Sequence, residues 1–583
     1  MKVIRDAVHG DIELSAEEMR VIHTAEFTRL HGCRQLGITH LIYPAAKHAR
    51  FEHVLGVLHV ASLIADELEK RKVFFIGENG ARLRSILRFS ALLHDMGHVP
   101  FGHTLEDEMP VISKHDIPSE GQTTSRMDVA VRAVLNESGN SAFIEPVLQV
   151  LRAIAESKDD DILYRSVNEK LIHPDYLALA DIIGNTICAD LLDYIKRDHI
   201  MTGIRATYDD RILRYFGIGE HRHVVFDQKT GKRVEKRYKR VVINLVKNGR
   251  VRNDALADLL DILKLRYNLS DKVLFHPKKC SADAMLIRAI TELGLTAEDL
   301  IKLSDDGLLD QYREHPLISM IRRRELFKPV FSCGPSHVSS YDKEMDTEEL
   351  VNRVHSDTKL RGEIEHAVEN ELGLPGGQAS VLVFCPRMKM TFKPIRALVT
   401  WKDGTVKRLN ELEEKHDVLT AKQISLLQEI YYGLWKLYVF VPPSLRSRGA
   451  QIQRKFVEIL KQKTGLIVAS DPALQNYLET GCADYAFGQA LGEELEQDPR
   501  YHQLEHQEQA TVATRCFAKL PRDPWDDAFS EQDTLVASRL EPEALARQVK
   551  AIIDGELPAK GKKDRAKADS SSQSVTDSQT KLL

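Results

Sequence analysis

Side chains of the types that bind metals cluster between positions 94 and 103 of this 583-residue chain. His94 and Asp95 follow an apolar helical stretch, and Gly97, His98 and His103 come directly after them. Gly97 suits a helix end, where the turning backbone can bring two adjacent side chains to one metal ion. Imidazole and carboxylate together suit a transition metal or a Mg- or Mn-type ion. A His-Asp pair alone is more often a structural contact, so the interpretation needs further ligands.

Two further candidate ligands lie on neighbouring predicted helices. His53 opens an apolar helix, and Asp190 lies within a later one. Each alone would be interpreted as a packed histidine or a surface acid. Three helices of one bundle, however, can direct such side chains into a shared interior. With His94 and Asp95, these residues predict a four-ligand site for a divalent metal ion, with Mg, Mn, Fe, Zn, Ni and Co all acceptable.

The elements that position these residues are predicted to be helices. Apolar residues recur at helical spacing through the first 200 residues, which we expect to be essentially all α. The expected helices cover residues 17–37, 53–71, 82–96, 126–137, 144–156 and 175–199. In the last of them, Asp190, Tyr194, Arg197 and Asp198 fall on one face.

The pattern changes in the second half of the chain. Residues 223–245 alternate like two strands around a polar turn with Gly231, and residues 378–401 also alternate like strands. Helices are predicted again at 253–268, 281–294, 420–440 and 450–463. We therefore predict a mainly α fold, with a helical bundle that holds the metal site and a smaller α+β C-terminal lobe.

The predicted units follow from breaks in these patterns. FKPVFSCGPS interrupts the helical pattern near residue 330. The units are a catalytic core at 1–330, an α+β lobe at 331–469, a helical extension at 470–559 and a disordered tail at 560–583. The tail is rich in Ser, Lys and Asp and poor in apolar residues.

Composition argues against several classes of protein. The net charge of −5 provides no global attraction to nucleic acid or to an anionic membrane. Seven scattered cysteines without a CxxC pair argue against a disulfide framework or a thiolate zinc site. The N-terminus lacks a signal-peptide pattern, and no stretch of about 18 apolar residues occurs. We expect a cytoplasmic protein without membrane contact.

Three strings surround the candidate ligands: RQLGITHLIYPAAKHARFEHVLGV at 34–57, LLHDMGHVPFGHTLED at 92–107 and ADLLDYIKRD at 189–198. Together they resemble the HD-domain phosphohydrolases, and in particular the deoxynucleoside triphosphate triphosphohydrolase (dNTPase) branch. The resemblance covers residues 1–330 well and extends weakly to about residue 465. It implies that residues 1–330 are an HD-domain catalytic core, with no SAM-type module before it.

The resemblance also implies an activity and residue roles. The reaction would be metal-dependent hydrolysis of deoxynucleoside triphosphates to deoxynucleoside and tripolyphosphate. The implied metal ligands are His53, His94, Asp95 and Asp190. The implied catalytic residues are His98, His103, Glu106 and His115, with Glu106 orienting His103.

A further set of residues is implied to contact the substrate. The set is Gln35, Leu36, Arg50, Tyr194, Asp198, Arg266, His276 and Lys278. Gln35 and Leu36 would lie against the sugar and leave no room for a 2′-hydroxyl. The cations of the set would neutralise the polyphosphate, for which arginine is well suited. The sequence departs from the family at Leu191 and Leu274, where a phosphate-binding lysine and a sugar-packing aromatic residue are common.

Regulation and assembly rest on the same resemblance. Thr28 and His31 occupy positions at which nucleotide-activated relatives carry a Gln and an Arg, so an activator site would be absent or altered. Family analogy predicts a homo-oligomer, a tetramer or hexamer. The role of residues 470–559 is left open by the sequence, and an added contact between subunits is one hypothesis. Nucleotide-pool control or antiphage defence would be the physiological role.

Two other functions remain open. The same metal site would suit a nucleotidase, or a single-strand nuclease or phosphodiesterase that uses a basic hairpin. That hairpin carries Lys229, Lys232, Arg233, Lys236, Arg237, Lys239 and Arg240, which are more simply interpreted as a solvated strand face. A third alternative is a nucleic-acid-binding scaffold with a vestigial metal site. The intact four-ligand set argues against it.

Overall fold

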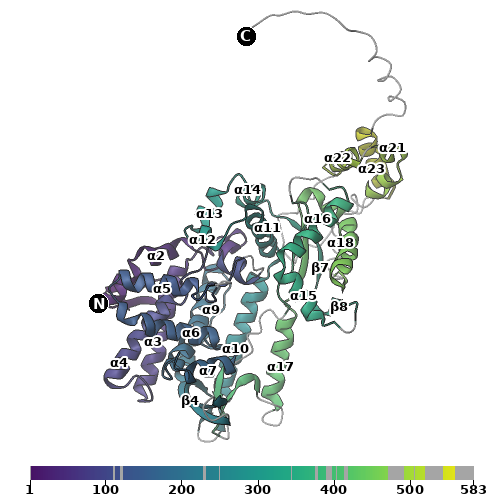
Figure 1. Cartoon of the computed structure of the whole chain (residues 1–583). Coiled ribbons are helices and arrows are strands. Elements are labelled where there is room, and N and C mark those ends of the chain that lie inside the picture. The colour runs from purple at the N-terminus through teal and green to yellow at the C-terminus, as the bar shows by residue number, and fades with distance from the viewer. Residues whose placement is uncertain are drawn as a thin grey trace, which may run out of the picture.

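Helices form most of the molecule, with a helical bundle as its larger part (Figure 1). The computed structural model describes residues 2–108, 112–118, 122–227, 232–247, 250–342, 345–374, 379–388, 397–401, 404–411, 418–470, 491–504, 506–518 and 542–557. The bundle contains α3 (Arg50–Lys70), α4 (Gly77–Leu93), α5 (Arg126–Glu137), α6 (Ile144–Glu156), α7 (Asp160–Asn168), α8 (Tyr176–Gly184), α9 (Ala189–Thr202) and α10 (Asn253–Leu269). The helices predicted at 53–71, 82–96, 126–137, 144–156 and 253–268 are confirmed, with shifted ends.

The helix predicted at 175–199 is interrupted, and the interruption matters for the site. The backbone of Asn185 is extended, and its side-chain oxygen accepts a hydrogen bond from the amide of Thr186 at 2.6 Å. This local bond competes with helix propagation. A new helix, α9, then begins at Ala189, so Asp190 lies in a first turn and not in a helix interior.

The expectation of an essentially all-α first segment was wrong near the N-terminus. Strands β1 (Lys2–Asp6) and β2 (Gly10–Leu14) form an antiparallel hairpin whose turn ends at Gly10, with φ of +78°. The helix predicted at 17–37 is also divided, because Thr24 has extended backbone and starts a new helix. Its pieces are α1 (Ala16–Ile22), α2 (Ala25–Thr28) and the 3-10 turns η1 (Arg29–Gly32) and η2 (Gly37–Leu41).

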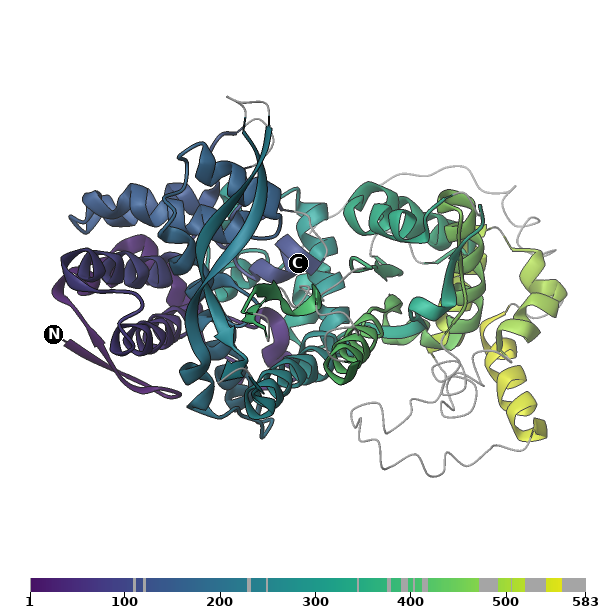
Figure 2. The ribbon, with the colours of Figure 1, turned by 90° about the horizontal axis from the view of Figure 1, so that it is seen from below.

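A long twisted hairpin crosses the bundle (Figure 2). Strands β3 (Phe216–Asp227) and β4 (Lys232–Asn244) confirm the predicted strand pair, and its turn with Gly231 lies outside the described residues. Strand β10 (Leu398–Thr400) pairs in parallel with β4, and β11 (Val406–Arg408) pairs with β10. Helix α17 (Val418–Tyr432) then buries Ile424 and Leu427 in the apolar core of the bundle. Short strands β5 (Val246–Lys247) and β6 (Arg250–Val251) complete this region.

A second apolar core lies beneath the loops that follow α4. It is built on α11 (Pro277–Leu293), which buries Met285, Leu286 and Ile290 against Val99 and Phe101. The short helices α12 (Ala297–Leu300), α13 (Asp305–Gln311) and α14 (Pro316–Arg322) cover the same core. The segment 98–105 is therefore held by elements far along the chain.

The remaining part is a mixed α+β lobe. Its antiparallel sheet has the order β7-β12-β9, formed by β7 (Lys328–Cys333), β12 (Leu437–Val441) and β9 (Leu382–Phe384). Helices α15 (Thr347–Ser356), α16 (Thr358–Glu371) and α18 (Gly449–Thr464) contribute to its core, and β8 (Val338–Ser340) pairs with β13 (Leu466–Val468). The prediction of one helix over 420–440 was wrong after residue 432, because Leu437–Val441 is a fully buried strand.

The last described segments are helical: residues 491–497, α21 (Pro499–His502), α22 (His506–Ala518) and α23 (Pro542–Glu556). The tail predicted at 560–583 lies outside the described residues. Within the described part, none of the helices is long and apolar enough to cross a membrane. The architecture confirms a mainly α fold with a smaller α+β lobe.

Candidate metal centre and surrounding site

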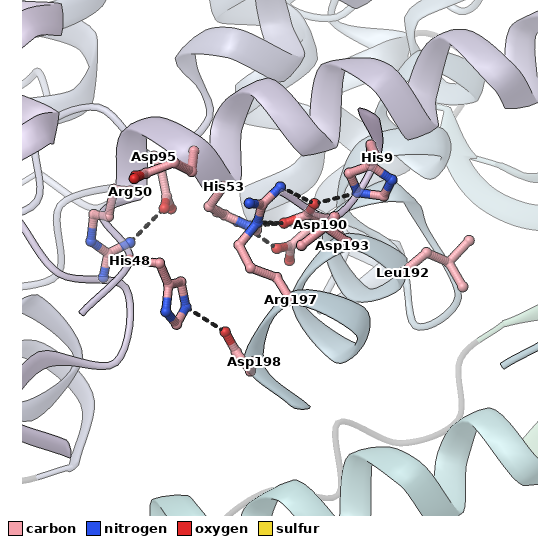
Figure 3. A network of polar contacts seen from close by, with 12 residues as sticks. His9, His48, Arg50, His53, Asp95, Asp190, Leu192, Asp193, Arg197 and Asp198 are labelled. Carbon is pink, nitrogen blue, oxygen red and sulfur yellow. Dashed lines mark hydrogen bonds and ion pairs between the residues drawn. The ribbon is translucent and has the colours of Figure 1, made fainter. Parts of the chain in front are cut away.

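Three helices bring the candidate metal ligands together. His53 lies in the first turn of α3, His94 caps the C-terminus of α4, and Asp190 lies in the first turn of α9. The ligand atoms of these three residues lie within 4.8 Å of one another. His53 Nε2 is 3.2 Å from Asp190 Oδ1, and Asp95 Oδ1 is 3.8 Å from His94 Nε2. Figure 3 shows His53 beside Asp190 and Asp193, and Asp95 bonded to Arg50.

Hydrogen bonds fix the orientation of both histidine rings. His53 Nδ1 donates to Asp193 Oδ2 at 2.8 Å, and His94 Nδ1 donates to the carbonyl of Ala91 at 2.8 Å. Each ring therefore keeps Nε2 as the atom that faces the cluster. His94 Nε2 is buried and has no hydrogen-bond partner within the described residues. A carboxylate or carbonyl behind each histidine is the usual support for a metal-binding imidazole, so the arrangement fits a divalent ion.

Asp193 is a functional candidate that the sequence patterns did not reveal. Its carboxylate contacts His53, accepts a bond from Arg197 and lies 2.7 Å from His9 Nε2. Arg197 in turn donates to Asp6 at 2.8 Å, and both Asp193 and Arg197 are fully buried (Figure 3). The only sequence signal was the position three residues after Asp190 on the same helix. The network attaches the N-terminal hairpin to the back of the metal cluster.

This network gives the cluster a negative field. Burial alone would lower the pKa of His53, but its hydrogen bonds to Asp190 and Asp193 raise that pKa to about 10. The same carboxylates that favour a proton on His53 favour a bound cation in its place. A proton and a metal ion therefore compete for this position.

A second cluster of histidines follows α4. His98 Nε2 is 3.4 Å from Asp95 Oδ1, and the His98 and His115 rings lie 3.6 Å apart. The buried carboxylate of Glu106 is 3.2 Å from His98 Nδ1 and 3.0 Å from His115 Nδ1. Arg126 also donates to Glu106, at 2.7 Å. Glu106 thus lies behind His98 and His115, as Asp193 lies behind His53.

His103 is the exposed member of the histidine group. Its ring lies 5.2 Å from that of His98, and its side chain is open to solvent. Burial would raise the pKa of Glu106, but His98 and His115 outweigh this effect and hold it well below its usual range. The two histidines therefore favour the ionised form of Glu106. The contacts described above connect it to His98 and His115, and its proposed orientation of His103 stays a prediction.

An apolar surface lies beside the metal cluster. Leu36, Ala46, Leu269 and Val273 form a small buried core, against which Tyr194 packs. Leu274, noted as a departure from the family, belongs to the same group, whereas Leu191 is buried in the core of the bundle. These side chains together form an aliphatic and tyrosine wall.

Gln35 has an unsatisfied acceptor beside this wall. Its backbone amide donates to the carbonyl of His48 at 3.0 Å, which fixes the loop. Its side-chain oxygen is buried and lacks a hydrogen-bond partner within the described part of the chain. An unpaired buried acceptor is costly, so Gln35 is suited to receive a donor from a ligand.

Cations of the predicted substrate set differ in their surroundings. Arg266 on α10 is half-buried, and its raised pKa, which burial opposes, reflects nearby Tyr194, Tyr431 and Asp190. No hydrogen bond to its guanidinium is present among the described residues. His276 caps α11 and accepts the amide of Lys278 at 3.2 Å, so both residues lie at the start of that helix. Arg266 and Lys278 are therefore the candidate phosphate-binding cations of this set.

Two residues predicted to contact substrate have internal partners. Arg50 is 1% exposed and donates to Asp95 Oδ2 at 2.5 Å. Asp198 is 3% exposed and lies 2.8 Å from His48 Nε2, a residue that the sequence patterns did not single out (Figure 3). Burial opposes ionisation of Asp95, yet Arg50 and His94 hold its pKa well below its usual range. Arg50 therefore orients Asp95 within the cluster.

Comparisons with known proteins agree with this geometry. The HD domain family matches residues 50–198, the segment that contains all four candidate ligands. An uncharacterized protein of Methanocaldococcus jannaschii is 30% identical over 487 residues, which cover 79% of this chain and 88% of that protein. The deoxynucleoside triphosphate triphosphohydrolase SAMHD1 homolog of Dictyostelium discoideum is 25% identical over 56% of this chain and 60% of its own length. Human SAMHD1 is 30% identical over 38% of this chain, and the match spans 36% of the human protein.

Solved structures support the fold alone. A hypothetical protein of Aquifex aeolicus superposes with a TM-score of 0.51 at 19% identity, covering 78% of this chain and 99% of that protein. The family match and the Methanocaldococcus relative together decide the assignment, and the histidine and aspartate cluster agrees with the metal dependence of HD domains. The chain is a metal-dependent phosphohydrolase and belongs to the HD-domain superfamily.

Proposed function

We propose that the protein hydrolyses deoxynucleoside triphosphates to deoxynucleoside and tripolyphosphate, with a divalent ion held by His53, His94, Asp95 and Asp190. The observation that carries the proposal is the convergence of His53, His94 and Asp190, with the Nε2 atoms of both histidines directed into the cluster. Asp95 Oδ1 lies 3.8 Å from His94 Nε2, at the edge of this group. Tyr194 of the apolar wall and the cation Arg266 both interact with Asp190. A triphosphate and a nucleoside need these two environments side by side.

A bound divalent ion would polarise the α-phosphoryl oxygen and lower the pKa of a bound water. The chain's own residues do the rest of the work. Attack of water oxygen on the α-phosphorus breaks its bond to the 5′-oxygen, and that oxygen must take up a proton. His103 is the accessible histidine beside the cluster and is our candidate for this donor. Glu106 keeps His98 and His115 oriented, with Nε2 of each ring left for the phosphate.

The polyphosphate would contact Arg266 and Lys278. Arg266 has the planar guanidinium that binds phosphate oxygens in pairs, and Lys278 adds a second charge. The sugar would pack on Leu36 and Tyr194, close enough that a 2′-hydroxyl would meet the buried Leu36 side chain. Asp198 would affect the substrate indirectly, by holding the loop at His48. Arg50 would do so by orienting the metal ligand Asp95.

Arg266→Ala is expected to raise KM for a deoxynucleoside triphosphate about tenfold to a hundredfold, because a charge-assisted hydrogen bond contributes roughly 1.5–3 kcal/mol. The bound metal should not change. The matched control is Lys264→Ala, an exposed cation on the same helix that pairs with Asp261 at 3.1 Å. Steady-state kinetics and metal analysis of both variants test this. Equal KM values in the two variants would remove Arg266 from the binding site.

An altered activator site is part of the proposal. The Thr28 hydroxyl donates to the carbonyl of Thr24 at 2.8 Å, and the His31 ring stacks on Phe51 at 3.7 Å. Both side chains have internal partners at the positions where activated relatives bind a nucleotide. We therefore expect turnover of a single deoxynucleoside triphosphate without a guanine nucleotide.

Product analysis tests the function as a whole. Purified protein is incubated with each deoxynucleoside and ribonucleoside triphosphate, singly and in mixtures, with Mg²⁺ or Mn²⁺. Phosphorus NMR and chromatography should show tripolyphosphate and deoxynucleoside. Pyrophosphate with a nucleoside monophosphate, or cleavage of single-stranded oligonucleotides alone, would overturn the proposal. The second outcome would favour the nuclease alternative. The basic hairpin argues against that alternative, because Arg222 lies 3.8 Å from Glu235 and Arg237 lies 3.5 Å from Glu220, so part of its positive charge is paired.

A further inference from the structure

A buried carboxylate outside the matched HD segment touches two loops of the site. Asp305 is the first residue of α13 and is 0% exposed. Its Oδ2 accepts a hydrogen bond from the backbone amide of Arg34 at 2.9 Å, and its Oδ1 accepts one from the amide of Phe101 at 3.0 Å. One side chain therefore joins segments that are 67 residues apart in the sequence (34 to 101).

The two amides belong to the loops that carry proposed site residues. Arg34 directly precedes Gln35 and Leu36, which would contact the sugar. Phe101 lies between His98 and His103 and has a φ of +55°, a conformation that non-glycine residues rarely adopt and that needs support from its surroundings. The bond from its amide to Asp305 supplies such support.

The same loops pack directly on each other and on α13. A Cβ at Gly37 would lie 3.6 Å from the Phe101 ring, and Gly37 itself has a φ of +51°. A Cβ at Gly32 would lie only 2.6 Å from Cβ of Ser304, the residue before Asp305. These approaches leave little room for one loop to shift without the other.

Asp305 is not chiefly one half of a salt bridge. The Arg34 guanidinium donates to Asp306 at 2.6 Å, whereas its nearest approach to Asp305 is 3.8 Å. Burial raises the pKa of Asp305 to about 6, although both amides and the more distant Arg34 and Arg50 act against the rise. A buried carboxylate without a close cation is costly, which argues for a positional use of its two oxygens.

We propose that Asp305 is a positioning residue that fixes the sugar-contacting loop at Gln35 and Leu36 relative to the histidine turn at His98 and His103. Sugar selection and proton transfer are then set by one shared anchor, and a change at Asp305 affects both. The kinetic part of this inference rests on the proposed function, whereas the anchoring itself does not.

Asp305→Asn is the test variant, and Asp306→Asn is its matched control. Asparagine has the same shape but a single acceptor oxygen, so one of the two amides loses its partner. Because the two loops pack on each other, losing either bond should loosen both segments. Asp306 is the adjacent residue, and its side chain is 70% exposed. In the full-length protein, we expect hydrogen exchange of peptides covering 33–37 and 99–103 to accelerate about tenfold or more in Asp305→Asn only. If exchange accelerates in only one of the two peptides, or in neither, Asp305 does not hold the two loops together.

The kinetic measurement separates positioning from general destabilisation. We expect the ratio of kcat/KM for a deoxynucleotide to that for its ribonucleotide to fall about tenfold in Asp305→Asn, with bound metal unchanged. An equal loss on both substrates overturns the positioning role. If the variant does not fold, exchange in the wild-type protein decides: both amides should be protected to the same degree, and one freely exchanging amide overturns the proposal. Absence of any turnover in the wild-type protein would reject the proposed function, while the exchange result would still stand.

Discussion

Replacing Asp190 by asparagine is expected to release the bound metal and to lower kcat by about 10³-fold or more, since the Lewis-acid contribution of a metal amounts to several kcal/mol. The change removes the anionic oxygen that lies 3.2 Å from His53 Nε2. Because Asp190 is at the start of α9, and asparagine is also acceptable there, the helix should persist. Metal analysis of the purified variant and product formation at saturating substrate measure the two effects.

Asp210→Asn is the control for this experiment. Asp210 is also an aspartate, and its side chain is 68% exposed. It pairs with Lys196, which lies on α9 together with Asp190. It should keep full metal content and activity. Retention of stoichiometric metal by Asp190→Asn, with unchanged kcat, would remove Asp190 from the ligand set.

Asp193→Ala is expected to reduce both stability and metal affinity. The change leaves the guanidinium of Arg197, which is 0% exposed, with Asp6 as its remaining acidic partner. Removing one member of a buried ion pair costs about 3–5 kcal/mol, and loss of the support behind a metal-binding histidine lowers metal affinity about 10- to 100-fold. Urea unfolding of the metal-free protein and a metal titration separate the two effects.

The matched control is Asp66→Ala, which breaks a pair with Arg84 at 2.6 Å on the surface of the bundle. This pair is partly exposed, so its loss should change the free energy of unfolding by less than about 1 kcal/mol. If Asp193→Ala also changes the free energy of unfolding by less than about 1 kcal/mol, the buried Arg197 guanidinium does not need Asp193 as a partner. Unchanged metal affinity would show that His53 keeps its orientation without it.

The sequence was most informative where the chemistry is local. His94 and Asp95 are adjacent, and the helices that carry them and His53 have strong apolar periodicity, so the cluster could be predicted. The contacts that support the metal cluster could not be predicted. Asp193 receives His9 from 184 residues away, and Asp198 receives His48 from 150 residues away. Such contacts depend on the packing of whole elements, so the sequence alone does not show that His9 meets Asp193 or that His48 meets Asp198.

The errors in the fold have related causes. Apolar periodicity did not mark the break at Asn185, because one side-chain bond to a neighbouring amide decides it. It also failed at residues 437–441, where LYVFV is apolar at every position and lies between two strands. A fully buried strand has no alternation to distinguish it from the end of a buried helix.

The parallel pairing of β4 with β10 has a consequence for biosynthesis. Val399 pairs with Ile243, so a strand near residue 400 is added to a hairpin made about 150 residues earlier. Ile424 and Leu427 then cover part of the bundle's apolar core. A growing chain of 330 residues would therefore expose an open strand edge and an uncovered apolar face. Chaperone dependence of the nascent protein should be greatest after β4 has been made and before α17 has been made. Expression of residues 1–330 alone should yield aggregates.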